Sequence, residues 1–181
     1  MKKNVIVFGS ISGLIVSVWL VCGIALCYSK GNFEGNMVLG YASMLLAFSL
    51  VFVGIKNYRD KYNGGVISFG KAFTLGLYIT LIASTMYVIV WLIDYYVFIP
   101  DFMDRYSAHV ISKAQSSGAS AAEIAGKTKE ITAMKEMYSS PVWVVLFTYL
   151  EILPVGLIVS ILSALILKRK VNNDNILAVN S

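Results

Sequence analysis

The chain has 181 residues, of which 57% are apolar and 14% are charged. Soluble domains are about 45–50% apolar and about 25% charged, so this chain lacks the charge needed to cover a soluble surface of its size. A mean hydropathy of +0.72 agrees with this. The composition therefore argues against a soluble enzyme and against a soluble nucleic-acid-binding protein. It indicates a small, all-α, polytopic membrane protein.

The first apolar run follows two lysines and extends from Val5 to Tyr28. It has 24 residues without a formal charge, which at about 1.5 Å per residue exceed a hydrocarbon core of about 30 Å. A cleaved secretory signal has an apolar core of only about 7–15 residues. We therefore expect this run to be retained as a membrane-spanning helix.

Three further apolar runs follow, each bounded by residues that interrupt helices. A turn rich in glycine and asparagine precedes the second run, and Gly64–Gly65 precedes the third, which Pro100 ends. Pro141 opens the fourth run, because proline is well tolerated in the first turn of a helix. The spans are predicted at residues 5–28, 37–55, 69–99 and 142–167. They form a single transmembrane domain, residues 1–170, followed by a short polar cytoplasmic tail, residues 171–181.

Basic residues gather at one end of the four predicted spans. With the N-terminus inside, the cytoplasmic side carries nine lysines and arginines against two acids, whereas both outer connections are neutral. Because cytoplasmic loops are enriched in Lys and Arg, this predicts an N-in, C-in topology. The pI of 9.1 then reflects orientation in the membrane and not binding of nucleic acid. Beyond the N-terminal pair, the inner basic residues are Lys56, Arg59, Lys61, Lys71, Lys168, Arg169 and Lys170.

Residues 101–140 are the only long polar region and predict an extracytoplasmic helical hairpin between the third and fourth spans. Asp101 can cap the first helix, Gly118 marks the break, and Ser120 and Glu123 have the spacing of a capping box. We expect the hairpin to stand on the outer face and to use narrow apolar stripes for packing. These stripes are Phe102, Tyr106 and Val110 in the first helix, and Ile124, Ile131, Met134 and Tyr138 in the second.

Two carboxylates lie within the predicted spans, where an unpaired charge is costly. Glu151 lies roughly 13–14 Å into the fourth span, Asp94 lies near the outer end of the third, and Pro154 frees the carbonyl of Leu150 beside Glu151. In one interpretation, Asp94, Glu151 and Pro154 form an intramembrane polar site on a hydrated path. In the other, Asp94 belongs to the membrane interface, while Glu151 is protonated and hydrogen-bonded between helices.

The remaining polar residues give no sign of catalysis, of a cofactor or of a metal site. Cys22 and Cys27 point about 140° apart on one helix and are expected to act as small apolar residues. His109 lacks a second ligand at metal spacing and is expected to be solvated. Small residues recur at helix-contact spacing from Gly9 to Gly13 and again at Gly156, Ser160 and Ala164, which favours close helix packing.

Several segments resemble one family of small membrane proteins. They are Gly40–Tyr41 through Lys56–Asn57–Tyr58–Arg59, Gly65–Phe73 with its Ser–Phe–Gly–Lys–Ala–Phe sequence, Tyr95–Tyr96 through Pro100–Asp101–Phe102, and Ser163–Lys170. On these segments the chain resembles domain-of-unknown-function family 4199, abundant in Bacteroidota, over about residues 4–170. The resemblance implies four helices in a bacterial inner membrane and assigns no activity and no functional residue.

These observations favour an integral inner-membrane protein without catalysis, acting as a scaffold or accessory subunit. Its expected partners are the lipid bilayer and a membrane protein or a second copy of itself. The alternative is a small oligomeric transporter or proton-coupled channel that uses the intramembrane carboxylates. A weaker alternative is a lipid-binding organiser that uses the inner basic residues.

Overall fold

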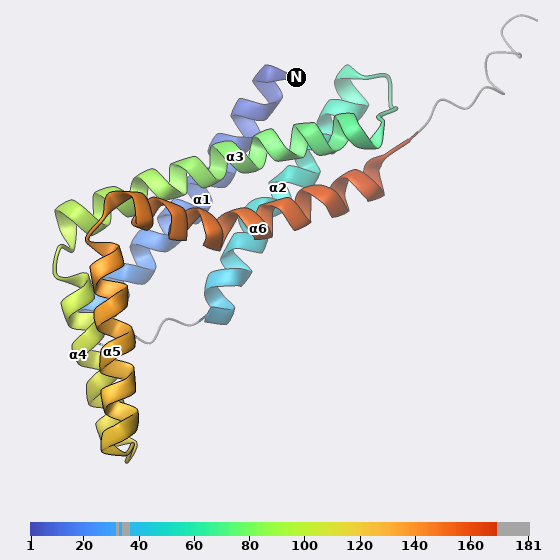
Figure 1. Cartoon of the computed structure of the whole chain (residues 1–181). Helices are drawn as coiled ribbons and strands as arrows, with labels where there is room; N and C mark the ends of the chain where they lie inside the picture. Colours follow the sequence, from blue (N-terminus) through green and yellow to red (C-terminus); the bar gives the residue numbers. More distant parts are fainter. Residues whose placement is uncertain (32, 34–36, 170–181) are drawn as a thin grey trace, which may run out of the picture.

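The computed structural model describes residues 1–31, 33 and 37–169, which are almost entirely helical. Lys170, the tail at 171–181 and Glu34 of the outer turn lie outside the described residues. The all-α prediction is confirmed. In chain order the elements are α1 (Lys2–Lys30), α2 (Met37–Tyr62), α3 (Phe69–Ile93), the π-helix η1 (Asp94–Phe98), α4 (Phe102–Ser116), α5 (Ala121–Tyr138) and α6 (Pro141–Leu167) (Figure 1).

Among the described residues, four helices are long and apolar enough to cross a membrane: Lys2–Lys30, Val38–Tyr62, Phe69–Phe98 and Pro141–Leu167. The helix that contains the second predicted span continues beyond residue 55 through a polar end to Tyr62. The helix of the third run changes to a π-helical turn at Asp94. Helices of this length exceed the hydrocarbon thickness and must tilt or project beyond it.

The outer surface of these helices is apolar, as lipid contact requires. Leu14, Val18, Leu46, Ile158 and Ile166 each keep more than half of their surface exposed. A soluble monomer rarely exposes so much contiguous apolar surface. The arrangement of side chains thus agrees with the composition in indicating a multi-pass membrane protein.

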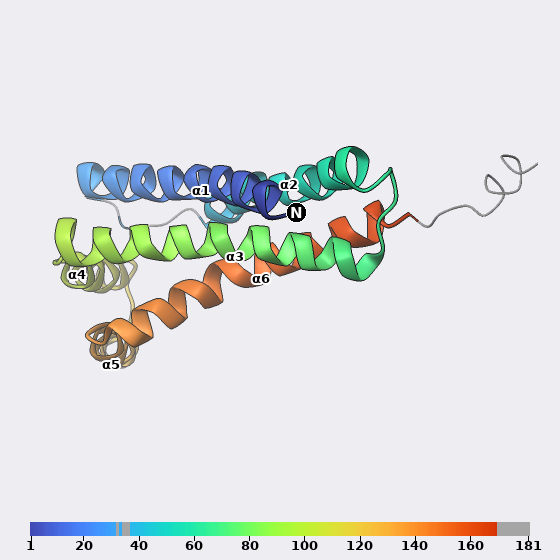
Figure 2. The same ribbon diagram turned by 90° about the horizontal axis from the view of Figure 1, so that it is seen from above.

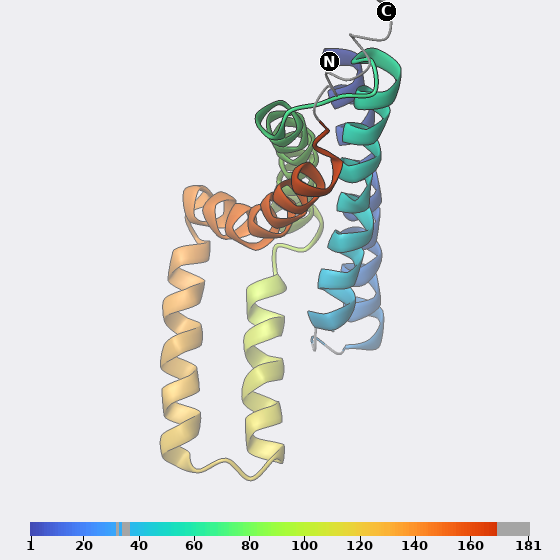
Figure 3. The same cartoon turned by 90° about the vertical axis from the view of Figure 1, so that its right-hand side faces the viewer.

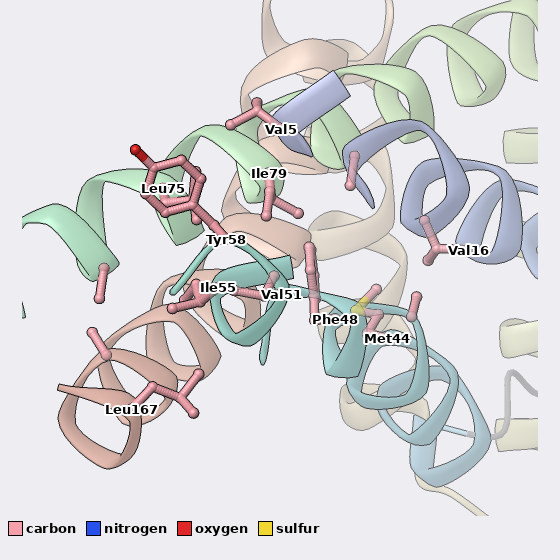
Figure 4. Close-up of a cluster of buried hydrophobic side chains, with 14 of the residues drawn as sticks. Val5, Val16, Met44, Phe48, Val51, Ile55, Tyr58, Leu75, Ile79 and Leu167 are labelled. Atoms are coloured by element: carbon pink, nitrogen blue, oxygen red, sulfur yellow. The ribbon is translucent and has the colours of Figure 1, made fainter. Parts of the chain in front are cut away.

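The four long helices form two layers, with α1 and α2 in one and α3 and α6 in the other (Figure 2). Helix α3 packs against α1, α2 and α6. Helices α1 and α2 cross α3 and α6 obliquely, so the layers diverge away from the crossing (Figure 1). The core follows the crossing, where Val51 and Ile55 of α2 lie near Leu75 and Ile79 of α3 (Figure 4).

Glycines permit the close approach of helices at the crossing. A Cβ atom added to Gly156 of α6 would lie 2.9 Å from Cζ of Phe48 and still closer to Thr80 of α3. One added to Gly9 or Gly13 of α1 would lie within 3 Å of side chains of α3. The small-residue patterns therefore pack within the bundle, as the sequence suggested.

Hydrogen bonds join three helices at the end of the bundle where α2 and α6 end and α3 begins. Ile67, before α3, and Arg169, after α6, exchange both backbone hydrogen bonds, with N–O distances of 3.0 and 2.8 Å. Arg59 of α2 donates to the carbonyl oxygen of Leu167 at 3.3 Å. Lys71 of α3 donates to Asn63 at 2.7 Å. Three of the basic residues predicted to lie on the inner side, Arg59, Lys71 and Arg169, therefore lie at the same end of the bundle, and their hydrogen bonds help to hold that end together.

Helices α4 and α5 form the predicted hairpin, but it leans away from the axes of α3 and α6 and does not stand upright on them (Figure 3). The break is at Gly118, with φ of +76°. The capping box is confirmed, because Ser120 accepts from the amide of Glu123 while Glu123 accepts from the amide of Ser120. These bonds hold the pKa of the Glu123 carboxyl below its usual range.

One detail of the hairpin prediction is wrong. Asp101 makes no side-chain capping bond, because its carboxylate instead accepts from Tyr28 of α1 at 2.9 Å and from Arg105 at 2.5 Å. The hydrogen bond from Arg105, followed by that from Tyr28, lowers the pKa of Asp101. The apolar stripe of α5 packs in part, since Ile131 is buried and Ile124 and Tyr138 are half-buried, whereas Met134 is exposed.

The close contact at Gly156 gives a stability prediction. We expect Gly156→Ala to lower the midpoint of thermal unfolding in detergent, because the added methyl group displaces Thr80 or Phe48 at a cost of about 1–3 kcal/mol. Gly40→Ala is the matched control, since a Cβ there meets nothing within 4 Å. Equal midpoints for the two variants would contradict the packing at this crossing.

Candidate functional site

A cavity of about 530 Å³ lies between the C-terminal half of α1 and the N-terminal part of α2. Its size is in the range of small-molecule sites. Helix α1 lines it from Val16 to Lys30, which at about 1.5 Å per residue spans about 20 Å. Tyr87 of α3 and Glu151 of α6 complete its lining. The cavity is therefore a long slot whose walls come from all four long helices.

The glycines of the slot differ from those of the helix crossing. Gly23 of α1 and Gly40 of α2 line the cavity, and a Cβ atom added to either meets nothing within 4 Å. At the crossing, by contrast, glycines allow neighbouring helices to approach closely. The slot thus opens where the oblique helices have diverged from one another.

Glu151 lies toward the Val16 end of this slot, since its partner Tyr87 follows Met86, which lies against Gly13 of α1. The residue is exposed on the surface of the bundle, and Oε1 accepts a hydrogen bond from the hydroxyl of Tyr87 at 3.5 Å. No described Lys or Arg lies within salt-bridge distance of it. The structure therefore shows features of both interpretations, because the carboxylate has an interhelical hydrogen bond and yet lines an accessible cavity.

Lys30 lies at the other end of the slot, at the last residue of α1. Among the described residues that line the cavity, Lys30 and Glu151 are the only charged ones. The wall between them is apolar and includes Trp19, Leu20 and Met44. A ligand in the slot would therefore meet a carboxylate at one end, an ammonium group at the other, and hydrocarbon between them.

Asp94 is not part of this cavity. It is 9% exposed at the start of η1, and its Oδ2 has no hydrogen-bond partner among the described residues. π-Helical turns are rare and often occur at functional positions. Tyr87, the hydrogen-bond partner of Glu151, lies seven residues before Asp94, which at about 1.5 Å per residue separates the two carboxylates by about 10 Å along the third span.

Aromatic side chains occupy the region between the two carboxylates. Tyr138 of α5 stacks on Phe147, one turn before Glu151, with ring centroids 5.8 Å apart. Tyr95, next to Asp94, donates its hydroxyl to the carbonyl oxygen of Tyr138 at 3.5 Å. The sequence predicted neither this aromatic cluster nor the slot, because both depend on how the helices pair.

The other candidate residues lie apart from the slot or on its wall. Pro154 is exposed within α6, which continues as a helix through it. Cys22 and Cys27 line the cavity as free thiols. His109 is half-buried beside Phe33, with ring centroids 6.2 Å apart, and is not a solvated side chain as expected. Among the described residues, no group of three or more His, Cys, Asp or Glu is placed to hold a metal ion.

The buried, unpartnered oxygen of Asp94 gives a second prediction. We expect Asp94→Asn to raise the midpoint of thermal unfolding, because it removes a carboxylate that costs about 1–3 kcal/mol when it is buried without a partner. Glu151→Gln is the control: its amide oxygen can still accept from Tyr87, and we expect little change. A lower midpoint for Asp94→Asn would show that this carboxylate stabilises the fold.

Comparison with known proteins gives one match. A family model described as "protein of unknown function (DUF4199)" matches residues 7–169. No curated protein and no solved structure matches the chain. The match includes all four long helices and the hairpin between α3 and α6. The chain therefore belongs to the DUF4199 family.

Proposed function

We propose that this protein resides in a bacterial inner membrane with both termini in the cytoplasm and the α4–α5 hairpin outside. The basic residues support this orientation. Arg59, Lys71 and Arg169 gather at the end of the bundle opposite the hairpin, together with exposed Lys56, Lys61 and Lys168. An excess of Lys and Arg is typical of the cytoplasmic side.

Cysteine labelling tests this topology. In a chain with Cys22→Ala and Cys27→Ala, we expect Gly126→Cys on exposed α5 to react with a membrane-impermeant maleimide in intact spheroplasts. Lys61→Cys, at the opposite end, should react only after lysis. The reverse pattern would overturn the proposed orientation.

Within that membrane, we propose a non-catalytic scaffold or accessory subunit that binds a partner through the hairpin. The observation that carries this proposal is the surface of α5. Ile131 is its only buried residue, yet the helix is capped by Ser120 and Glu123 and ion-paired to α4 through Lys135 and Asp104. Helix α5 is thus held in place by polar contacts, while it buries little of its own surface against the rest of the chain.

The exposed face of α5 indicates what kind of partner fits. Met134 and Met137, one helical turn apart, are 39% and 37% exposed among charged residues. Methionine is flexible and polarisable and adapts to protein surfaces. We therefore take the partner to be an extracytoplasmic protein surface with an apolar patch that covers this methionine pair.

Purification from native membranes in mild detergent tests the scaffold function. We expect a stoichiometric protein partner that is lost when Met134→Ser and Met137→Ser are combined. Ala125→Ser, an exposed change on the same helix, should retain it. A homo-oligomer without any partner, or a partner retained by the double variant, would contradict the proposal.

The alternative function is passage of a cation or proton through an oligomer. One observation favours it, which is that Glu151, an exposed residue, lines the slot. Its separation from Asp94 weakens a path that uses both groups. A flux assay on reconstituted protein distinguishes the two functions. Transport abolished by Glu151→Gln would favour the alternative.

A further inference from the structure

We propose that the slot between α1 and α2 is a binding site for an elongated amphipathic monocation, with its amine at Glu151 and its apolar chain along α1. This inference concerns a different surface from the hairpin and does not rest on the scaffold function. It is carried by the distribution of charge along the slot and by the shape of the slot.

The inner end of the slot favours a cation. A carboxylate within the membrane is costly unless it is paired, hydrated or protonated. The only hydrogen bond that the described residues give Glu151 is the 3.5 Å contact from Tyr87, and its side chain remains exposed. An ammonium group offers this carboxylate several N–H donors, and charge-assisted hydrogen bonds are the strong ones.

Two aromatic side chains of the cavity lining, one of which is the hydrogen-bond partner of Glu151, add to this preference. Trp19 and Tyr87 both line the cavity. Aromatic rings attract ammonium groups through their faces, and the attraction is strongest where water is excluded. The combination of one carboxylate with two aromatic side chains therefore selects a positively charged group over a neutral or negative one.

The middle of the slot selects an elongated apolar chain. Leu20, Ile24, Leu39 and Met44 line it, while Gly23 and Gly40 contribute no side chain and keep it open. The length along α1, about 20 Å, suits a linear chain and not a compact ion. A small inorganic cation would leave most of this apolar wall without contact.

The outer end limits the ligand to one positive charge. Lys30 lines the cavity where α1 ends, at the level where lipid headgroups lie if the helix spans the membrane. An ammonium group on the far end of the ligand would meet this lysine and be repelled. An apolar or anionic far end would be accepted.

Binding of tritiated dodecylamine to the full chain in nanodiscs tests this site, with empty nanodiscs subtracted. We expect one saturable site per chain. Glu151→Gln should weaken binding about tenfold or more, the loss expected for a charge-assisted contact. Gly40→Leu should weaken it similarly, because the new side chain fills the slot while the carboxylate remains.

Two controls separate these effects from loss of the fold. Asp94→Asn changes an intramembrane carboxylate outside the slot and should leave the affinity unchanged. Gly126→Leu adds the same side chain as Gly40→Leu to exposed α5 and should also have no effect. The midpoint of thermal unfolding of each variant verifies that the protein is folded.

Competition experiments define the ligand class. We expect 1,12-diaminododecane to compete less well than dodecylamine on the wild type, and Lys30→Gln to reduce this difference. Dodecanoate should compete poorly. Equal binding of dodecylamine to the wild type and Glu151→Gln, or equal competition by dodecanoate, would overturn the proposal and indicate a slot for lipid chains. If Glu151→Gln loses dodecylamine binding but retains the hairpin partner, then ligand binding in the slot and partner binding by the hairpin are independent of each other.

Discussion

The structure depends on the close crossing of α3 with its neighbours. Between apolar helices in lipid, burial of apolar surface supplies little driving force, so association relies on close contact and on interhelical hydrogen bonds. Here Gly9 and Gly13 bring α1 onto α3, and Gly156 brings α6 onto α3. Thr80 and Ser160, 3.1 Å apart, add a hydrogen bond at the same place.

One consequence is the asymmetry between the two ends of the bundle. At the end of the bundle where α3 begins, Ile67 and Arg169 exchange backbone hydrogen bonds, and the guanidinium of Arg59 donates to the carbonyl oxygen of Leu167. These bonds tie α2, α3 and α6 together. Toward the opposite end, the oblique layers diverge and leave the slot between the helices. Glu151 lies where the slot begins, so its exposure is a product of helix geometry as well as of its position in α6.

The parts of this structure that the sequence predicts are those fixed by local chemistry. Apolar length identifies the four spans, and the Ser120–Glu123 spacing predicts a cap that needs only four residues to form. The parts it does not predict depend on contacts between distant segments. Asp101 looks like a cap but bonds to Tyr28, 73 residues away. Gly40 and Gly156 are the same residue type, yet one lines an open slot and the other a crowded crossing, a difference that only the pairing of helices determines.

The slot and the hairpin meet at the end of α1. Cys27 and Lys30 line the slot, and Tyr28 between them donates to Asp101 at the start of α4. Arg105 completes this contact, because it bonds to Asp101 and lies over the Tyr28 ring with 5.0 Å between Cζ and the ring centroid. The position of the outer wall of the slot is therefore set partly by the hairpin, and the tilt of the hairpin is set partly by α1. A partner that holds the hairpin acts on the same helical turn that a ligand in the slot would touch.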